Sequence, residues 1–181
     1  MLVMQVTWSD FIALPDDDRR ELVGGQLLEI DVPTHLHEHI VTMVAYFLTA
    51  WRRAGAGGNV LSSGYKIRIS DEQAFMPDVQ YFKPGRVIPE QALAEGGPDL
   101  AVEVISPSSA RFDSVEKLAG YASIGTAEYW LIDPEKRTLQ RYLLQGRELM
   151  LAERLEGDVP FKPATFSALE VPLGELWNVP I

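Results

Sequence analysis

Cysteine is absent from the 181-residue chain. A disulfide framework, a zinc site with thiolate ligands and a cysteine nucleophile are therefore excluded, and the reducing cytoplasm is the expected location. The first nine residues contain no cationic stretch followed by an apolar one, and no apolar run approaches the roughly 18 to 20 residues that span a bilayer. We therefore expect neither export nor membrane insertion.

Positive charge is also scarce. Sixteen Lys and Arg residues stand against 26 Asp and Glu residues, which gives a net charge of -10 and a pI near 4.7. Such a balance weakens the attraction to polyphosphate backbones. The sequence has no glycine pattern of a Walker or dinucleotide-binding loop, and its three histidines lack the spacing of a histidine-rich metal site.

The chain length is sufficient for one domain, which we predict to span residues 1–181, and the composition is that of a globular protein. No repeat, linker or low-complexity tract divides it. Helices are predicted from the capping box Thr7–Asp10 to Pro15, from Thr34 to Gly55 and over 111–125, with a helical turn within 83–98. Strands are predicted at 21–23, 26–30, 65–70, 79–82, 100–105, 129–132, 139–144 and 148–155.

This order of elements predicts an α/β (α+β) fold rather than a strict alternation of strands and helices. A mixed central sheet would be flanked by helices, with one hairpin near each end of the chain. The apolar run 100–105 has the character of a fully buried strand, so we expect it to be the central one.

Two acidic residues are hard to explain as scaffolding. Glu103 interrupts the apolar run 100–105, where a carboxylate must be paired, protonated or bound to a cation. Asp78 follows Pro77 at the mouth of a predicted strand. Two acids that converge on neighbouring strands repel each other unless a proton or a divalent cation lies between them, as in a magnesium site with oxygen ligands.

Structural explanations remain open for both residues. Asp78 could be an Asx-type residue that opens a strand, and Glu103 could be the partner of an Arg or Lys.

Four motifs and one lysine share the pattern of a known family. They are ELVGGQL at 21–27, MPDV at 76–79, PDLAVEVISPSS at 98–109, EYWLIDP at 128–134, and Lys117. Together they resemble the Uma-two family, a widespread group of bacterial domains, over nearly the whole chain. That family is similar to restriction endonucleases of the PD-(D/E)xK superfamily, so the resemblance implies a restriction-endonuclease-like core and a magnesium- or manganese-dependent phosphodiesterase site.

The resemblance also implies roles for individual residues. Asp78 and Glu103 would be metal ligands, and Glu21 would be the early acid that completes the site as the third ligand. The strand lysine of the superfamily motif is missing, because Ile105 stands two positions after Glu103. Its place is taken by Lys117 in the following helix, which would stabilise negative charge on the phosphate or orient the attacking water.

Helical geometry predicts the side of the helix on which Lys117 lies. At 100° per residue it lies opposite the apolar positions 115, 118, 119 and 122, so it should face solvent or a cleft rather than the core. The simple alternative is a surface ion pair with Asp113. On the preceding helix, His37 projects with the apolar face, where a packed core histidine is favoured over a contact with a site carboxylate.

Three functions follow. The first is a metal-dependent endonuclease that hydrolyses DNA, with a local basic groove from residues that flank the site: Lys66, Arg68, Lys83, Arg86, Arg111 and Lys117. The second is a non-catalytic dimerisation or protein-binding module on a nuclease fold, with an apolar patch that could include Trp8, Trp177 or Tyr142. The third is a metal-dependent hydrolase of small phosphoesters. We further expect a homodimer or a higher homo-oligomer.

Overall fold

The structure, a computed structural model, describes residues 5–15, 18–29, 32–62, 64–106 and 113–179, without the side chains of 113 and 114. Arg111, the start of the predicted helix 111–125 and most of the SPSS corner therefore lie outside the described residues. Within these ranges, no helix combines the length and the apolar character that crossing a membrane requires.

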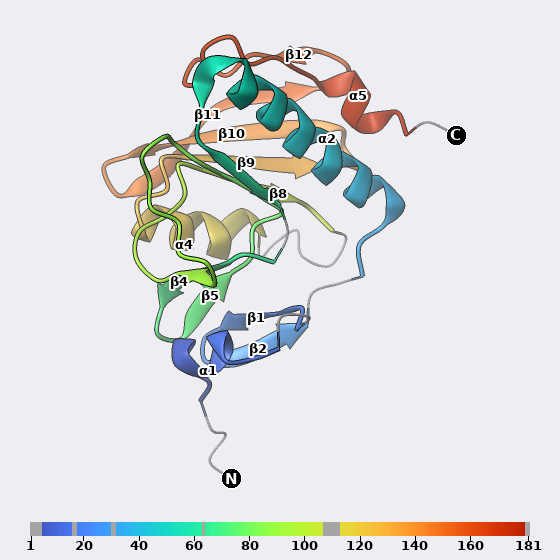
Figure 1. The fold of residues 1–181 in the computed structure, drawn as a ribbon. Helices are drawn as coiled ribbons and strands as arrows, with labels where there is room; N and C mark the ends of the chain where they lie inside the picture. The colour runs from blue at the N-terminus through green and yellow to red at the C-terminus, as the bar shows by residue number, and fades with distance from the viewer. Residues whose placement is uncertain (1–4, 16–17, 30–31, 63, 107–112, 180–181) are drawn as a thin grey trace.

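A six-stranded sheet forms the centre of the fold (Figure 1). Its order is β11-β10-β9-β8-β6-β3. The strands are β3 (Asn59–Ser62), β6 (Val79–Phe82), β8 (Leu100–Val104), β9 (Glu128–Asp133), β10 (Thr138–Gln145) and β11 (Glu148–Glu156). β8 and β9 are parallel and the other neighbours are antiparallel, so the predicted mixed sheet is confirmed. β8 lies inside the sheet and is buried at every position, as expected of a central strand.

A second sheet of five strands has the order β2-β1-β5-β4-β7. The strands are β1 (Arg20–Val23), β2 (Gln26–Glu29), β4 (Lys66–Ser70), β5 (Gln73–Phe75) and β7 (Ala92–Leu93). Gly24 and Gly25 both have positive φ, which the tight turn of the predicted β1–β2 hairpin requires. The helical turn predicted within 83–98 is wrong, because β7 instead pairs in parallel with β4.

Four helices are described. α1 (Trp8–Ile12) begins at the predicted capping box, and both of its reciprocal hydrogen bonds are present. α2 (His35–Trp51) begins at the N-cap Thr34 and continues into a π-helical turn, η1 (Arg52–Ala56). A second π-helical turn, η2 (Asp113–Lys117), leads into α4 (Leu118–Ser123). α5 (Leu173–Trp177) follows the short pair β12 (Pro160–Phe161) and β13 (Val171–Pro172).

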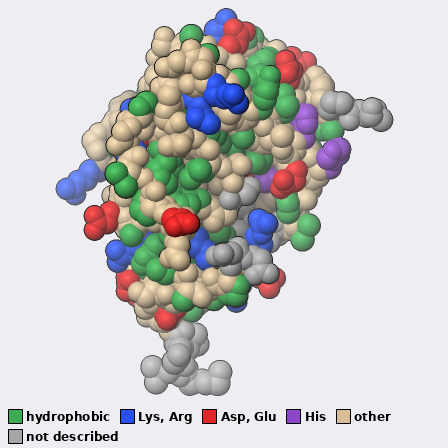
Figure 2. Space-filling model, in the orientation of Figure 1, with side chains coloured by type: hydrophobic (Ala, Val, Ile, Leu, Met, Phe, Trp, Pro, Cys, Tyr) green, Lys and Arg blue, Asp and Glu red, His purple; other side chains and the backbone are tan. Residues whose placement is uncertain are grey.

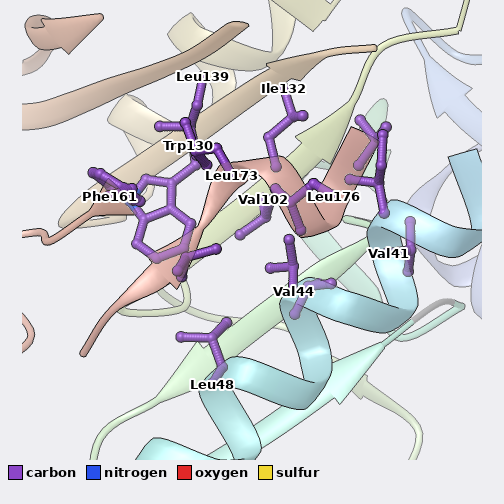
Figure 3. Packing of buried hydrophobic residues seen from close by; sticks show 14 of the residues in the cluster. Val41, Val44, Leu48, Val102, Trp130, Ile132, Leu139, Phe161, Leu173 and Leu176 are labelled. Atoms are coloured by element: carbon purple, nitrogen blue, oxygen red, sulfur yellow. The ribbon is translucent and has the colours of Figure 1, made fainter. Parts of the chain in front are cut away.

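Each face of the six-stranded sheet covers its own core. On one face, α2 and the C-terminal segment pack through residues such as Val44, Leu48, Val102 and Leu176, whose side chains meet in Figure 3. Fully burying one such side chain contributes about 1.5–3 kcal/mol, so this packing is the main support of α2. On the other face, α4 and strands of the second sheet enclose a smaller core that includes Tyr121. α2 and α4 therefore lie on opposite sides of the central sheet (Figure 1).

Candidate active site

Glu103 is the penultimate residue of β8, on the face of the strand that it shares with Ala101 and Ile105. Val102 and Val104 point the other way, into the α2 core. The predicted alternation along this strand is therefore confirmed. The Glu103 side chain is only 4% exposed, so its carboxylate needs compensating partners inside the protein.

Lys117 supplies one of these partners. Its Nζ lies 3.0 Å from Oε2 of Glu103 and 3.1 Å from Oε1 of Glu21, and its side chain is 7% exposed. Lys117 does not face solvent, one of its two predicted environments, and its burial excludes a purely surface ion pair. The Asp113 side chain, the partner in that alternative, lies outside the described residues.

The apolar face predicted for this helix is confirmed only in part, because Leu118 and Ala122 pack in the core around Tyr121 but the other two positions are exposed. Val115 is 58% exposed, whereas Lys117, Gly120 and Tyr121 are buried. The physical reason is the π-helical turn η2, whose i→i+5 hydrogen bonding winds more residues into each turn than the assumed 100° per residue. The segment consequently turns its polar Lys117 and Tyr121 toward the sheet.

Tyr121 was not predicted as a site residue. It is fully buried, and its hydroxyl donates a hydrogen bond of 2.7 Å to Oε1 of Glu103. Burial and the neighbouring Glu103 carboxylate raise the pKa of Tyr121 well above its usual value, so the hydroxyl stays protonated and remains a donor. The available signal was spacing, because Tyr121 is one helical turn after Lys117.

Glu21 enters the site from β1 of the second sheet. Its Oε1 accepts a hydrogen bond of 3.1 Å from the Met76 backbone N–H, as well as contacting Lys117. Met76 directly precedes the Pro77-Asp78 pair. Glu21 thus connects the N-terminal hairpin both to Lys117 and to the backbone that leads into Asp78.

Asp78 lies immediately before β6. Its Oδ2 accepts a hydrogen bond of 2.7 Å from the Val104 backbone N–H, and Oδ2 is also 3.5 Å from His37 Nε2. The register of β6 and β8, continued by one residue from Val79 opposite Val102, places Asp78 opposite Glu103. The predicted convergence of these two acids from adjacent strands is supported by this register.

His37 lies at the start of α2 and contacts the site carboxylate, the less favoured of its two predicted environments. Burial lowers the pKa of His37, but the hydrogen bond and charge of Asp78 outweigh it, so the net pKa is raised above 6.5. The helix pattern placed His37 beside the core without indicating which strand end it would meet.

The donor chemistry of the site suits a hard divalent cation, since Asp78, Glu103 and Glu21 offer carboxylate oxygens. Across the described ranges, however, no group of three or more His, Asp or Glu side chains is arranged as a metal cage. Lys117 Nζ lies between the Glu21 and Glu103 oxygens. Of the three predicted ligands, Asp78 is the one with no contact to Lys117 among the ion pairs of the described residues, and the strand register places it opposite Glu103.

The described residues of the predicted basic groove are either buried or paired with acidic side chains, as Arg68 is with Asp71. Lys66 is buried and donates to the Phe11 carbonyl, and Lys117 is buried in the site. Lys83 and Arg86 both pair with Asp99, whose single carboxylate offsets one of their two charges. On the face shown in Figure 2, the described Lys and Arg side chains lie singly or in small groups, interspersed with acidic ones.

The apolar patch expected for a binding module does not include the predicted tryptophans. Trp8 and Trp177 are both buried, and Tyr142 is half-buried. Trp8 packs on Phe11 in the N-terminal core, and Trp177 donates to the Gly157 carbonyl. These aromatic side chains stabilise the fold instead of forming a surface.

Comparisons with known proteins agree with this architecture. The family model Uma2, described as "Putative restriction endonuclease", matches residues 8–174. The crystal structure of "a putative nuclease belonging to DUF820" from Anabaena variabilis ATCC 29413 is similar, with a TM-score of 0.77 and 20% identity over 95% of this chain and 97% of that chain. No curated protein matches the sequence. The predicted fold class and family resemblance are confirmed.

Proposed function

The chain belongs to the Uma2 family, and from this premise we propose that it is a divalent-metal-dependent endonuclease that hydrolyses phosphodiester bonds in DNA. Asp78 and Glu103 are the proposed ligands of Mg²⁺ or Mn²⁺, and Lys117 is the proposed charge-stabilising residue. The observation that carries the proposal is the 3.0 Å contact between Lys117 Nζ and Glu103 Oε2 in a buried position. A lysine from a separate helical segment thus contacts Glu103, whose own strand lacks the lysine of the superfamily motif.

Each residue of the proposed site has a separate role. A bound divalent ion would lower the pKa of a water molecule and offset charge on the phosphate. Asp78 is held in place by the Val104 N–H, and Glu103 by the Tyr121 hydroxyl. A phosphate oxygen that enters the site would accept a hydrogen bond from the Lys117 ammonium, which stabilises negative charge most strongly where water is excluded.

A metal-dependent hydrolase of small phosphoesters is the second candidate. It is favoured by the pairing of Lys83 and Arg86 with Asp99, which leaves less positive charge for a long duplex. Both candidates use the same carboxylates and Lys117, so they differ in substrate rather than in chemistry. The cytoplasmic location, the single domain and the homo-oligomer stay predictions from the sequence.

Cleavage of supercoiled plasmid with Mg²⁺ or Mn²⁺ tests the proposal, with bis(p-nitrophenyl) phosphate as the small-substrate arm. We expect Asp78→Asn and Glu103→Gln each to lower the cleavage rate at least about 100-fold, since each removes a ligand. Asp71→Asn is the matched control, because Asp71 is 63% exposed and pairs only at the surface with Arg68. It should cleave at the wild-type rate.

Calorimetric titration with Mn²⁺ supplies an independent measurement. Asp78→Asn should weaken the binding of the ion, whereas Asp71→Asn should not. If no substrate is cleaved with either ion and Asp78→Asn leaves Mn²⁺ affinity unchanged, both hydrolase proposals are wrong. Cleavage of the small phosphoester without cleavage of single- or double-stranded DNA would select the second candidate.

A further inference from the structure

We propose that Glu21 is a positioning residue that holds the Lys117 ammonium, rather than a third ligand of the divalent ion. This inference rests on the proposed function and assigns a role within the same site. It starts from the contacts of one atom, Oε1 of Glu21, which lies 3.1 Å from Lys117 Nζ and also accepts the Met76 N–H at 3.1 Å.

The position of Lys117 argues against an ion shared by the two glutamates. Its ammonium is 3.1 Å from a Glu21 oxygen and 3.0 Å from a Glu103 oxygen, so it already lies where a bridging ion would bind. An ion at the usual Mg–O distance of about 2.0–2.1 Å from both oxygens would be repelled by this ammonium at close range.

Burial makes displacement of Lys117 unfavourable. The side chains of Lys117, Glu21 and Glu103 are 7%, 9% and 4% exposed. Moving the ammonium away would remove a positive neighbour from two buried carboxylates, and a buried charge is costly when its partner is lost. Asp78 is the more accessible ligand, with a side chain that is 21% exposed. Asp78 and Glu103 are therefore the residues that would hold the ion, since the strand register places them opposite each other.

Glu21 and Glu103 then have different tasks, although both touch Lys117. Glu103 would hold the ion, while Glu21, from the other sheet, would keep the Lys117 ammonium in place. The Met76 hydrogen bond keeps the Glu21 carboxylate oriented while it does so. Glu21 touches neither substrate nor ion in this arrangement and acts only through Lys117.

Glu21→Gln tests this role with little change in shape. The amide oxygen can still accept the Met76 N–H, whereas the negative charge beside Lys117 is lost. Glu29→Gln is the matched control, because Glu29 is an exposed glutamate in the same hairpin. Thermal denaturation of each variant establishes that it is folded.

The first readout is Mn²⁺ affinity without substrate. We expect the loss of affinity in Glu21→Gln to be at least about tenfold smaller than in Asp78→Asn, because only the latter removes a ligand. Glu29→Gln should bind like the wild type. A loss in Glu21→Gln equal to that in Asp78→Asn would overturn the proposal and make Glu21 a ligand.

The second readout is a double-mutant cycle on kcat with Lys117→Met. We expect Glu21→Gln to lower kcat at least tenfold in the wild type and less than about twofold in the Lys117→Met background, since it acts through that lysine. Losses that multiply independently would contradict the proposal. A purely structural role of Glu21 would lower stability in both backgrounds and would likewise give multiplying losses.

If Glu21→Gln does not fold, Glu21→Asp keeps the charge and withdraws the carboxylate by one methylene. The same two readouts then apply. The proposed function and this inference fail in different ways. If Asp78→Asn leaves Mn²⁺ affinity unchanged and no substrate is cleaved, the proposed metal site is wrong. If the Glu21 variant loses as much Mn²⁺ affinity as Asp78→Asn, only the positioning role of Glu21 is wrong.

Discussion

Replacing Tyr121 by Phe removes only the hydroxyl oxygen, and so tests how much its hydrogen bond to Glu103 stabilises the protein. The Tyr121 hydroxyl donates to the buried Glu103 carboxylate at 2.7 Å, while its ring packs 5.5 Å from the Phe75 ring and 5.4 Å from the Tyr129 ring. Phe retains both ring contacts, so the lost interaction is the hydrogen bond alone. A hydrogen bond to a charged group contributes about 1.5–3 kcal/mol, and Glu103 would keep its charge with one donor fewer.

For a protein of this size each kcal/mol shifts Tm by about 2–4 °C, so Tyr121→Phe should lower Tm by about 3–12 °C. Scanning calorimetry measures this change in Tm. Tyr142→Phe is the control, because its hydroxyl bonds to the neutral Gln140 amide at 2.7 Å in a half-buried position. The control should shift Tm by less than about 2 °C, since a neutral, partly solvated hydrogen bond contributes less. An unchanged Tm in Tyr121→Phe would refute the reasoning.

Three further predictions concern His37, Arg141 and Gly120. In the metal-free protein, NMR titration should show a lower pKa of His37 in Asp78→Asn than in the wild type, and an unshifted pKa would count against the contact. Because the pKa of His37 is raised in the folded state, the contribution of this contact to folding stability is complete below about pH 6.5. That contribution is lost as pH rises through the folded-state pKa. Arg141→Met strips the charged partner from buried Glu128 and should reduce the free energy of unfolding in urea by about 3–5 kcal/mol, a loss that a surface pair would not show. Gly120→Ala gains about 1 kcal/mol of helix propensity but places a Cβ 2.6 Å from a buried phenyl ring, so the urea midpoint should fall rather than rise.

The sequence was informative where local rules suffice. A carboxylate inside an apolar run marked Glu103, and a proline before a strand marked Asp78. Capping residues fixed the starts of α1 and α2, and a glycine pair located the first hairpin. Each of these signals involves neighbours within a few positions, which is the range over which backbone preferences act.

The remaining features depend on distant segments. The π-helical turn before α4 changed the face on which Lys117 lies, and nothing in the local periodicity indicated it. β7 has two residues and exists because β4 offers an edge to pair with, not because of its own propensity. The pairing of Lys83 and Arg86 with Asp99 likewise depends on how a loop folds back onto a strand end.

The origin of the site residues has a consequence for the order of folding. Glu21 belongs to one sheet, Glu103 to the other and Lys117 to the segment that leads into α4. Even the contact between Glu21 and Met76 closes a loop of 55 positions, and such closures are entropically unfavourable until the packing that follows compensates them. Glu21 therefore reaches Glu103 and Lys117 only when the two sheets have docked. A partly folded chain, such as one still emerging during synthesis, carries the residues of the site without their arrangement.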